Sequence, residues 1–358
     1  MNVIFLTPKV AADSVIIAKN LRQLDKNIKT YQLFPKEKKY IGYDTFFDYK
    51  IEDIVHQMSI FDFLNENPDI LPENSLFFIR TGYIIKQLTT IQEMGYRVIN
   101  TPESLTLTTD KYNLGVKLIE EGVNNPDTWL GYKGKNKDLM NETIDHIIKL
   151  FDNGYEELII KPSSSLSSCR GKWVHLIKKT YDRDEITKYL NKIPDGFPTN
   201  YKDGTRLCIQ SFVPYMAMHR IVVINGKAIK MSWMDRITKQ TIHSTQEWNF
   251  PMHLVDETAD YSQGSLGWKV SCCLNLDVIF NPDPDVELLS IAEKSQKAVG
   301  GEVNFIDVFE TKNSYVICEM NTSPPIIFPQ NLAKQHHHPQ WNFSSNIAKY
   351  LYSVGDKL

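Results

Sequence analysis

The sequence has no large excess of charge of either sign and no apolar run long enough to cross a bilayer. Its 40 Lys and Arg residues nearly balance 43 Asp and Glu residues, which leaves a formal net charge of −3 over 358 residues. This balance argues against bulk nucleic-acid binding, because a broad phosphate-binding surface needs a clear excess of cations. The apolar start, Met1–Leu6, ends before Pro8 and Lys9 and is too short for a signal peptide. We therefore expect a cytoplasmic protein with no nucleic-acid or membrane partner.

Cysteine is also scarce. The five cysteines are odd in number and show no CxxC spacing, so the pattern predicts neither a disulfide framework nor a zinc site. We expect reduced thiols, mostly in strands. Cys169 adjoins Arg170, which would favour a reactive thiolate, but a small residue that fills a loop is the preferred interpretation. The cysteines are Cys169, Cys208, Cys272, Cys273 and Cys318.

A run of three histidines, His336–His338, is the other candidate for transition-metal binding. Adjacent residues on any regular element point in different directions, so three consecutive imidazoles do not converge on one ion. We expect a solvated loop there.

The composition is that of a globular protein, with 42% apolar and 11% aromatic residues, and the length predicts two or three domains. The first hundred residues alternate between strand-like and helix-like patterns, which predicts a small βαβ domain with a largely parallel sheet. Thr101-Pro102 is expected to break this pattern. The expected strands are 2–6, 30–34, 75–80 and 98–100, and the expected helices are 14–24 and 84–94.

The rest of the chain predicts helices and antiparallel strands. Asn225-Gly226 is a strong hairpin signal between two strands. No periodicity is visible from Thr238 to Leu274, so we expect a long irregular segment there. The expected helices are 109–121, 144–151 and 286–299, and the expected strands are a short one around Trp129, then 157–161, 172–178, 206–213, 220–224, 227–233, 304–310 and 314–320.

Polar side chains within the last two apolar strands are the most informative feature. Burying Asp307 or Glu319 there is costly unless a cation or a donor meets the carboxylate. Glu319 and Asn321 are two residues apart and leave the same face of a strand, where Asp307 from the neighbouring strand can join them. Three hard oxygen ligands with room for phosphate oxygens describe a nucleotide-bound Mg²⁺ (or Mn²⁺) site. Considered in isolation, strand ends that face water are the simpler interpretation.

A second feature is Lys161, which closes an apolar strand and precedes a loop of small residues, Ser163–Gly171. Small residues let backbone N–H groups and hydroxyls approach a phosphate closely, and lysine supplies a compact positive charge. The alternative is a flexible surface loop. The segment has no GxxxxGK[ST] pattern, so it is not a Walker-A loop.

The order of these landmarks resembles the ATP-grasp superfamily, and within it ribosomal protein S6 glutamate ligase (RimK-like) and glutathione synthetase. The resemblance covers about Asn100 to Pro325 and implies an ATP-grasp fold preceded by a small α/β domain. Each motif is weak, but the ordered set is specific. The matching segments are Asn100–Ser104, Asp110-Lys111, Gly122–Thr128, Ile159–Pro162, Gln210–Val213, Arg220 with Val222–Lys227, Asp307 and Glu319–Pro324.

The resemblance also implies roles. Lys111 and Lys161 would hold the phosphates of ATP, and Arg220 would lie near the transferred phosphoryl group. The magnesium ligands would be Asp307, Glu319 and Asn321. The hinge strand whose backbone reads adenine would be Gln210, Ser211, Phe212 and Val213. The mobile loop over the phosphates would be Ser163–Gly171, including Ser165, Ser167, Ser168 and Gly171.

The sequence departs from the family pattern at four places. The phosphate loop is rich in serine rather than glycine, and Ser211 replaces the usual acidic residue before the hinge aromatic. Met218-His219-Arg220 stands where relatives have Asp-Ile-Arg, which removes a carboxylate from the edge of the site, and Pro325 replaces a common glycine. These changes are compatible with nucleotide binding but leave the acceptor undetermined.

The implied domains are an α/β domain over 1–100, a central subdomain with the phosphate loop over 101–205, and a C-terminal subdomain with the magnesium site over 206–350. The implied activity is an ATP-dependent carboxylate–amine ligase that produces ADP through an acyl phosphate. The amine acceptor would be an amino acid or a peptide, and a homodimer or homotetramer is possible for the family. Arg236 would bind the acceptor carboxylate, although an ion pair with Asp235 is equally plausible.

Two rival functions stay open from the sequence. One is a kinase on the same fold that phosphorylates a hydroxyl group, for example of an inositol phosphate. Such a site needs extra cations, which Lys172, Lys178 and Lys179 would supply, but the charge balance does not favour it. The other is a non-catalytic nucleotide-binding or scaffold protein, which the presence of both lysines and all three metal-ligand types argues against.

Overall fold

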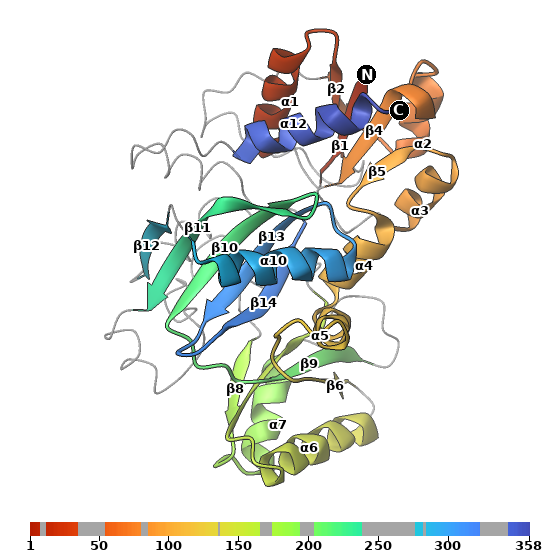
Figure 1. The fold of residues 1–358 in the computed structure, drawn as a ribbon. Coiled ribbons are helices and arrows are strands. Elements are labelled where there is room, and N and C mark those ends of the chain that lie inside the picture. The colour runs from red at the N-terminus through yellow and green to blue at the C-terminus, as the bar shows by residue number, and fades with distance from the viewer. Residues whose placement is uncertain are drawn as a thin grey trace.

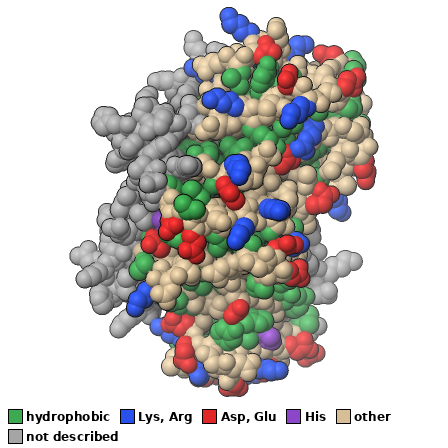
Figure 2. Space-filling view, in the orientation of Figure 1, with side chains coloured by type: hydrophobic (Ala, Val, Ile, Leu, Met, Phe, Trp, Pro, Cys, Tyr) green, Lys and Arg blue, Asp and Glu red, His purple; other side chains and the backbone are tan. Residues whose placement is uncertain are grey.

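The computed structural model consists of three β-sheets with their helices, stacked along the long axis of the molecule (Figure 1). None of the described helices is long and apolar enough to cross a membrane. Basic and acidic side chains are interspersed over the face shown in Figure 2, as the near-balanced charge predicts. The structure describes residues 1–7, 12–34, 54–79, 85–134, 137–164, 174–193, 204–237, 276–281, 284–322 and 343–358.

The N-terminal sheet has five parallel strands in the order β3-β2-β1-β4-β5, which confirms the predicted parallel sheet. Every residue of β1 and β4 is buried, as expected for parallel strands that are covered on both faces. The strands are β1 (Asn2–Leu6), β2 (Lys29–Phe34), β3 (Ile54–Gln57), β4 (Ser75–Ile79) and β5 (Arg97–Ile99). The helical elements of this region are α1 (Ala12–Leu24), α2 (Ile60–Glu66), the 3-10 turn η1 (Pro72–Asn74) and α3 (Ile85–Glu93).

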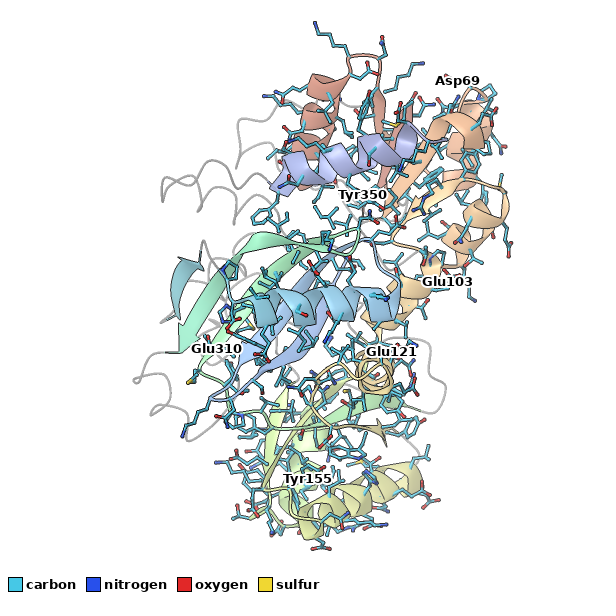
Figure 3. All side chains as sticks on the ribbon, in the orientation of Figure 1. Asp69, Glu103, Glu121, Tyr155, Glu310 and Tyr350 are labelled. Atoms are coloured by element: carbon cyan, nitrogen blue, oxygen red, sulfur yellow. The ribbon has the colours of Figure 1, made fainter. Side chains whose placement is uncertain are left out.

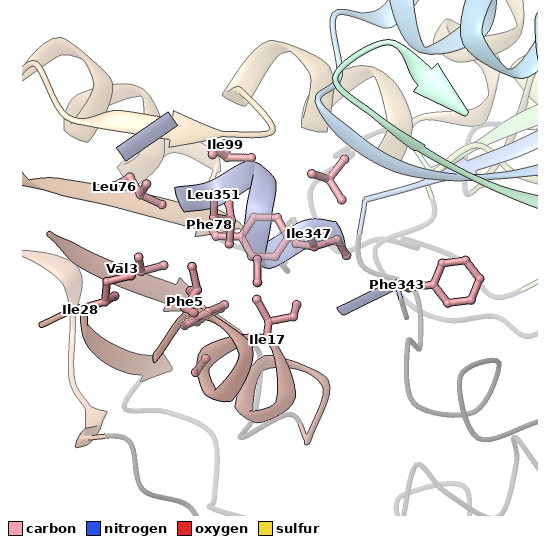
Figure 4. Packing of buried hydrophobic residues seen from close by; sticks show 14 of the residues in the cluster. Val3, Phe5, Ile17, Ile28, Leu76, Phe78, Ile99, Phe343, Ile347 and Leu351 are labelled. Atoms are coloured by element: carbon pink, nitrogen blue, oxygen red, sulfur yellow. The ribbon is translucent and has the colours of Figure 1, made fainter. Parts of the chain in front are cut away.

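The two faces of this sheet have different covers. One face packs on α2 and α3 through Phe63 and Leu88. The other packs on α1 and on the C-terminal helix α12 (Phe343–Gly355), which the sequence analysis did not predict. Figure 4 shows Ile347 and Leu351 of α12 packed among the buried side chains of the sheet and of α1. The chain therefore returns to its first domain, and both termini lie at the same end of the molecule (Figure 1).

The passage out of this domain differs from expectation. Thr101-Pro102 does not break the structure but begins helix α4 (Pro102–Thr109). The Thr101 hydroxyl accepts a hydrogen bond from the Ser104 N–H group at 3.3 Å, and proline is favoured in the first turn of a helix because its missing N–H group is not needed there. Helix α5 (Lys111–Glu120) follows directly, so the single helix expected over 109–121 is in fact the second of two.

The central sheet is antiparallel in the order β6-β9-β7-β8. Ile160 and Ile209 face α6 and α7 in one apolar core. The strands are β6 (Thr128–Lys133), β7 (Glu157–Pro162), β8 (His175–Lys178) and β9 (Thr205–Ser211), and the helices are α6 (Lys137–Asp152) and α7 (Arg183–Lys192).

The C-terminal sheet is antiparallel in the order β12-β11-β10-β13-β14. Asn225 and Gly226 have φ values of 49° and 75°, which confirms the predicted hairpin between β10 and β11. Helices α10 and α5 cover one face of the sheet. Its elements are β10 (Ala217–Ile224), β11 (Lys227–Ile237), β12 (Leu276–Asn281), α10 (Val286–Val299), β13 (Val303–Glu310) and β14 (Tyr315–Asn321).

The domain boundary expected at residue 206 falls inside strand β9. Strand β9 begins at Thr205 and pairs with both β6 and β7, so it belongs to the central sheet. We therefore propose that the two subdomains divide between Ser211, where β9 ends, and Ala217, where β10 begins.

The N-terminal domain and the C-terminal sheet are joined through buried polar groups. The Asn100 side chain accepts from the N–H groups of Glu302 and Val303 and donates to the Val303 carbonyl. The Glu302 carboxylate also forms an ion pair with Arg97 at 2.5 Å and accepts a hydrogen bond from the hydroxyl of Tyr350 in α12. Figure 3 shows Tyr350 between the upper domain and the sheet below it. Bonds from three distant segments thus fix the two layers together.

Prediction for His175. This side chain is only 5% exposed, both of its ring nitrogens lack a hydrogen-bond partner among the described residues, and burial together with Lys192 lowers its pKa to about 4. The unfolded chain therefore binds a proton between about pH 6.5 and pH 4 that the folded chain does not, so stability falls as the pH drops through this window. Replacing His175 with Phe should remove a penalty of about 2 kcal/mol at pH 5 and little at pH 8.

The measurement is urea denaturation of the wild type and His175→Phe at both pH values. Phenylalanine keeps an aromatic ring against Tyr189, whose ring centroid lies 5.8 Å from that of the histidine. A stability difference of the same size at pH 5 and pH 8 would contradict the prediction.

Candidate active site

Three charged residues form a row across neighbouring strands of the C-terminal sheet. Arg220 on β10 pairs in register with Asp307 on β13, and Asp307 pairs with Glu319 on β14. Directly opposed residues project from the same face of a sheet, so the three side chains share one face. The Arg220 Nε atom lies 3.3 Å from a carboxylate oxygen of Asp307. The row lies on the face opposite to α10, because the alternate residues Ile221 and Ile306 pack in the core with that helix.

A β-bulge lies next to this row. Asp307 pairs with Glu319 but Val308 pairs with Ile317, so Cys318 is an extra residue on β14. Such bulges re-aim neighbouring side chains and are common beside functional sites. Asn321, two residues beyond Glu319, pairs with Phe305 and hydrogen-bonds to the Glu319 carboxylate. The three residues predicted as metal ligands are therefore brought together on one face.

Two lysines from other elements complete the cluster. Lys111 is the first residue of α5, and its Nζ atom lies 3.9 Å from a carboxylate oxygen of Glu319. Lys161 on β7 is 9% exposed and pairs with Cys208, so it faces away from the core that contains Ile160. Lys161 is close enough to Glu319 to act on its ionisation. Lys111 and Glu319 are more than two hundred residues apart in the sequence, and the fold brings them together.

The charges in the cluster determine its ionisation. Burial alone would raise the pKa of Glu319, but Lys111, Lys161, Arg220 and the Asn321 hydrogen bond outweigh it and hold that pKa below its usual range. Glu319 is therefore an ionised carboxylate at neutral pH. Three cations surround two carboxylates, Asp307 and Glu319, which gives the cluster a net positive charge. Such a site favours a polyanion that carries a divalent cation.

The donor set fits a magnesium ion. Two carboxylates and one amide oxygen are hard ligands of the kind that Mg²⁺ binds, and they are too few to fill its six positions, so phosphate oxygens and water would supply the rest. Among the described residues no group of three or more His, Cys, Asp or Glu side chains is placed to hold a metal. The predicted ligand set therefore includes an amide, that of Asn321, beside the carboxylates of Asp307 and Glu319.

The predicted adenine hinge is divided by the structure. Gln210 is 5% exposed, pairs with strands on both sides, and donates to the Thr128 hydroxyl at 3.0 Å, so its side chain and its backbone already have partners within the sheet. The N–H groups of Ser211 and Phe212 donate to the carbonyls of Asp127 and Glu157. Our proposal for adenine recognition therefore rests on the Val213 N–H group and on carbonyl groups of the hinge.

Several predicted residues fall outside the described part of the chain. These are Ser165, Ser167, Ser168, Gly171, Cys169, the segment 238–274 and His336–His338. Arg236 is described only in its backbone, which pairs with Ala217, three residues before Arg220. The roles assigned to all of these residues stay predictions.

A polar network that was not predicted from the sequence supports the cluster. Arg206 on β9 forms a 2.8 Å ion pair with Asp110, the N-cap residue of α5. An aspartate directly before a predicted helix is a capping signal, so the role of Asp110 was accessible from the sequence. Its partner Arg206 was not, because 96 residues separate the two.

The sequence matches no protein-family model and no curated protein. Solved structures, in contrast, match it over its whole length. D-alanyl-alanine synthetase A from Vibrio cholerae has a TM-score of 0.59 at 12% identity, covering 100% of this chain and 98% of that one. D-alanine–D-alanine ligase from Bacillus anthracis has a TM-score of 0.57 at 14% identity, covering 100% and 99%. The ATP-grasp ligase PsnB, solved with a minimal precursor, Mg and ADP, has a TM-score of 0.56 at 11% identity, covering 99% and 97%.

The chain has the ATP-grasp fold. This confirms both the predicted α/β class and the fold inferred from the ordered motifs. The Bacillus anthracis ligase was also solved with ATP, and PsnB was solved with Mg and ADP. At identities of 11–14% this structural similarity establishes the fold alone, so the chemistry of this chain depends on what its own residues can do.

Prediction for the thiols. Burial raises the pKa of Cys208 to about 11 and that of Cys318 to about 12, although Lys161 and Lys111 act in the opposite direction on both. Thiols with such values stay protonated at pH 7.5 and react slowly, because the thiolate is the nucleophile. Iodoacetamide should therefore modify these two cysteines at least about a hundredfold more slowly in the native protein than in urea. Peptide mass spectrometry follows the modification, and rapid native labelling of Cys318 would contradict the assigned surroundings of the site.

Proposed function

We propose that this protein is an ATP-dependent carboxylate–amine ligase that forms an amide bond and releases ADP and phosphate. The observation that carries the proposal is the convergence of Lys111, Lys161 and Arg220 on the Asp307–Glu319 carboxylates within an ATP-grasp fold. The similar D-alanine–D-alanine ligases and PsnB support it, since all are ligases on this fold.

The cations have separate tasks in this proposal. Lys111 and Lys161 come from the central part of the chain and would hold the nucleotide phosphates as compact charges. Arg220 lies in the C-terminal sheet beside Asp307. There its planar guanidinium would stabilise the negative charge on the phosphoryl group during transfer. Phosphoryl transfer needs alignment and neutralisation of spread charge more than covalent help from the protein.

Asp307, Glu319 and Asn321 would hold Mg²⁺. When bound, the metal neutralises phosphate charge and fixes the orientation of the phosphate chain. The lysines explain why the Glu319 carboxylate stays ionised and available as a ligand, because Lys111 and Lys161 both lower its pKa.

The reaction proceeds in two steps. A substrate carboxylate oxygen attacks the γ-phosphorus of ATP, the bond to ADP breaks, and an acyl phosphate forms. An amine then attacks the acyl carbon, phosphate leaves, and the amine loses a proton. No protein nucleophile is needed, which agrees with the protonated thiols of Cys208 and Cys318 beside the site.

The acceptor is proposed only as a class. An amino acid or a peptide is equally compatible with the fold, since the similar structures include D-alanine–D-alanine ligases and a ligase solved with a precursor. Arg236 remains our candidate for the acceptor carboxylate because arginine binds carboxylates through two parallel hydrogen bonds. Assembly into a homodimer or homotetramer remains a prediction from the family resemblance.

Prediction for the charged cluster. Lys161→Ala and Glu319→Gln should each lower ATP turnover by at least about a hundredfold, because each removes charge stabilisation of the phosphates or of their metal. ADP release is the measured quantity, with circular dichroism to verify folding. Lys178→Ala and Glu310→Gln are matched controls: Lys178 lies in the central sheet in an ion pair with Glu157, and Glu310 ends β13 in contact with His219. Full activity of either test variant would refute the assignment.

Prediction for the products. Incubation of a host-cell extract, including its peptides, with Mg-ATP and wild-type protein should produce a compound with the mass of two reactants minus one water, together with ADP. The same extract with Lys161→Ala should not. Untargeted mass spectrometry compares the two samples. A compound that gains one phosphoryl group would identify a kinase instead, and condensation with AMP would overturn the acyl-phosphate route.

A further inference from the structure

The beginning of helix α5 is bonded directly to the residues that follow Lys161. The Lys111 N–H group donates to the Ser163 carbonyl at 2.6 Å, and the Tyr112 N–H group donates to the Ser163 hydroxyl at 3.3 Å. Ser163 is 1% exposed and lies two residues after Lys161. The segments that carry the two lysines of the cluster are therefore connected through a short set of hydrogen bonds.

Asp110 is the centre of this network. One of its carboxylate oxygens accepts from the Asn113 N–H group at 3.0 Å and from the Ser163 hydroxyl at 2.5 Å. The other accepts from Arg206 on β9 at 2.8 Å, and both side chains of this ion pair are about 15% exposed, at 14% and 16%. A single carboxylate thus joins the start of α5, the end of β7 and strand β9.

The same bonds change what the start of the helix can do. The first N–H groups of a helix normally form a site for anions. In α5 those of Lys111 and Tyr112 are bonded to Ser163, that of Asn113 to the Asp110 side chain and that of Leu114 to the Asp110 carbonyl. Phosphate binding at this end of α5 therefore depends on the Lys111 ammonium group, whose position depends on where the helix begins.

We propose that Asp110 is a positioning residue that holds Lys111 and Lys161 at the separation needed for the phosphate chain of the nucleotide. The inference rests on the proposed function. Two ammonium groups repel each other, so a site that needs both must fix them through their backbones before the nucleotide arrives. The hydrogen bonds of the Asp110 carboxylate to described residues go to Asn113, Ser163 and Arg206, and not to Asp307, Glu319 or Asn321.

A merely structural role makes a different prediction. Loss of an N-cap residue destabilises any helix, but it does not select among ligands. Asp182 provides the matched control, because it caps α7 in the same part of the molecule and accepts from the Glu185 N–H group at 2.8 Å. Asp182→Ala removes the same kind of cap without a bond to either lysine-bearing segment.

The experiment compares a ligand with phosphates and a ligand without them. Mg-ADP binding to the full chain is measured by calorimetry, and adenosine binding by ligand-observed NMR, which detects weak complexes. Asp110→Ala should weaken Mg-ADP binding by at least about tenfold, since a bond to a charged group is lost, and change adenosine binding by less than about twofold. Asp182→Ala should leave both affinities within about twofold of the wild type.

Three further results bear on the proposal. Equal weakening of both ligands by Asp110→Ala, or no weakening of Mg-ADP, would overturn it while leaving the proposed function intact. A wild type that binds no Mg-ADP would refute the proposed function, and this inference with it.

If Asp110→Ala does not fold, Asp110→Asn and Arg206→Gln are tested by the same criterion. Asparagine still caps a helix but lacks the negative charge that pairs with Arg206. Relative to Arg206→Gln, the variant Arg206→Lys should recover most of the wild-type affinity for Mg-ADP.

Discussion

The cluster of this protein depends on the mutual compensation of buried and half-buried charges. Three cations placed near one another repel, and two carboxylates placed near one another repel. Interleaving them solves both problems, because Glu319 lies against Lys111 and Asp307 lies against Arg220. The side chains of these four residues are only 12–31% exposed, so water screens them weakly. In the function proposed here, a polyanion with its metal would take the place of these existing ion-pair partners.

Each sheet contributes a different part of this arrangement. Register in the C-terminal sheet fixes Arg220, Asp307 and Glu319 in one row, and the bulge at Cys318 adjusts β14 beside that row. The central sheet presents Lys161 on the face away from its own helices. The N-terminal domain is tied to the C-terminal sheet through Asn100 and through α12. The charged cluster therefore lies where the central part of the chain meets the C-terminal sheet.

The apolar and polar halves of the C-terminal sheet share one face. Val222 and Phe305 pack into the core with α1 and α12, and two residues further along the same strands lie Arg220 and Asp307. The transition from core to site takes one alternation of a strand. Because core residues and site residues share the same strands, the strand sequences are mostly apolar and contain only single charged residues.

The sequence by itself determined the α/β class and the candidates Asp307, Glu319 and Asn321, because these depend on local patterns such as strand alternation and two-residue spacing. Lys111 and Arg220 were indicated only by the resemblance of the ordered motifs to the ATP-grasp superfamily. The tertiary structure decided what depends on long-range contacts. Long-range pairing places β9 in the central sheet, and packing places α12 against the first domain. Contacts between distant segments also pair Arg206 with Asp110 and the Gln210 side chain with Thr128. No local pattern encodes these, since each partner is chosen by packing between segments far apart in the chain.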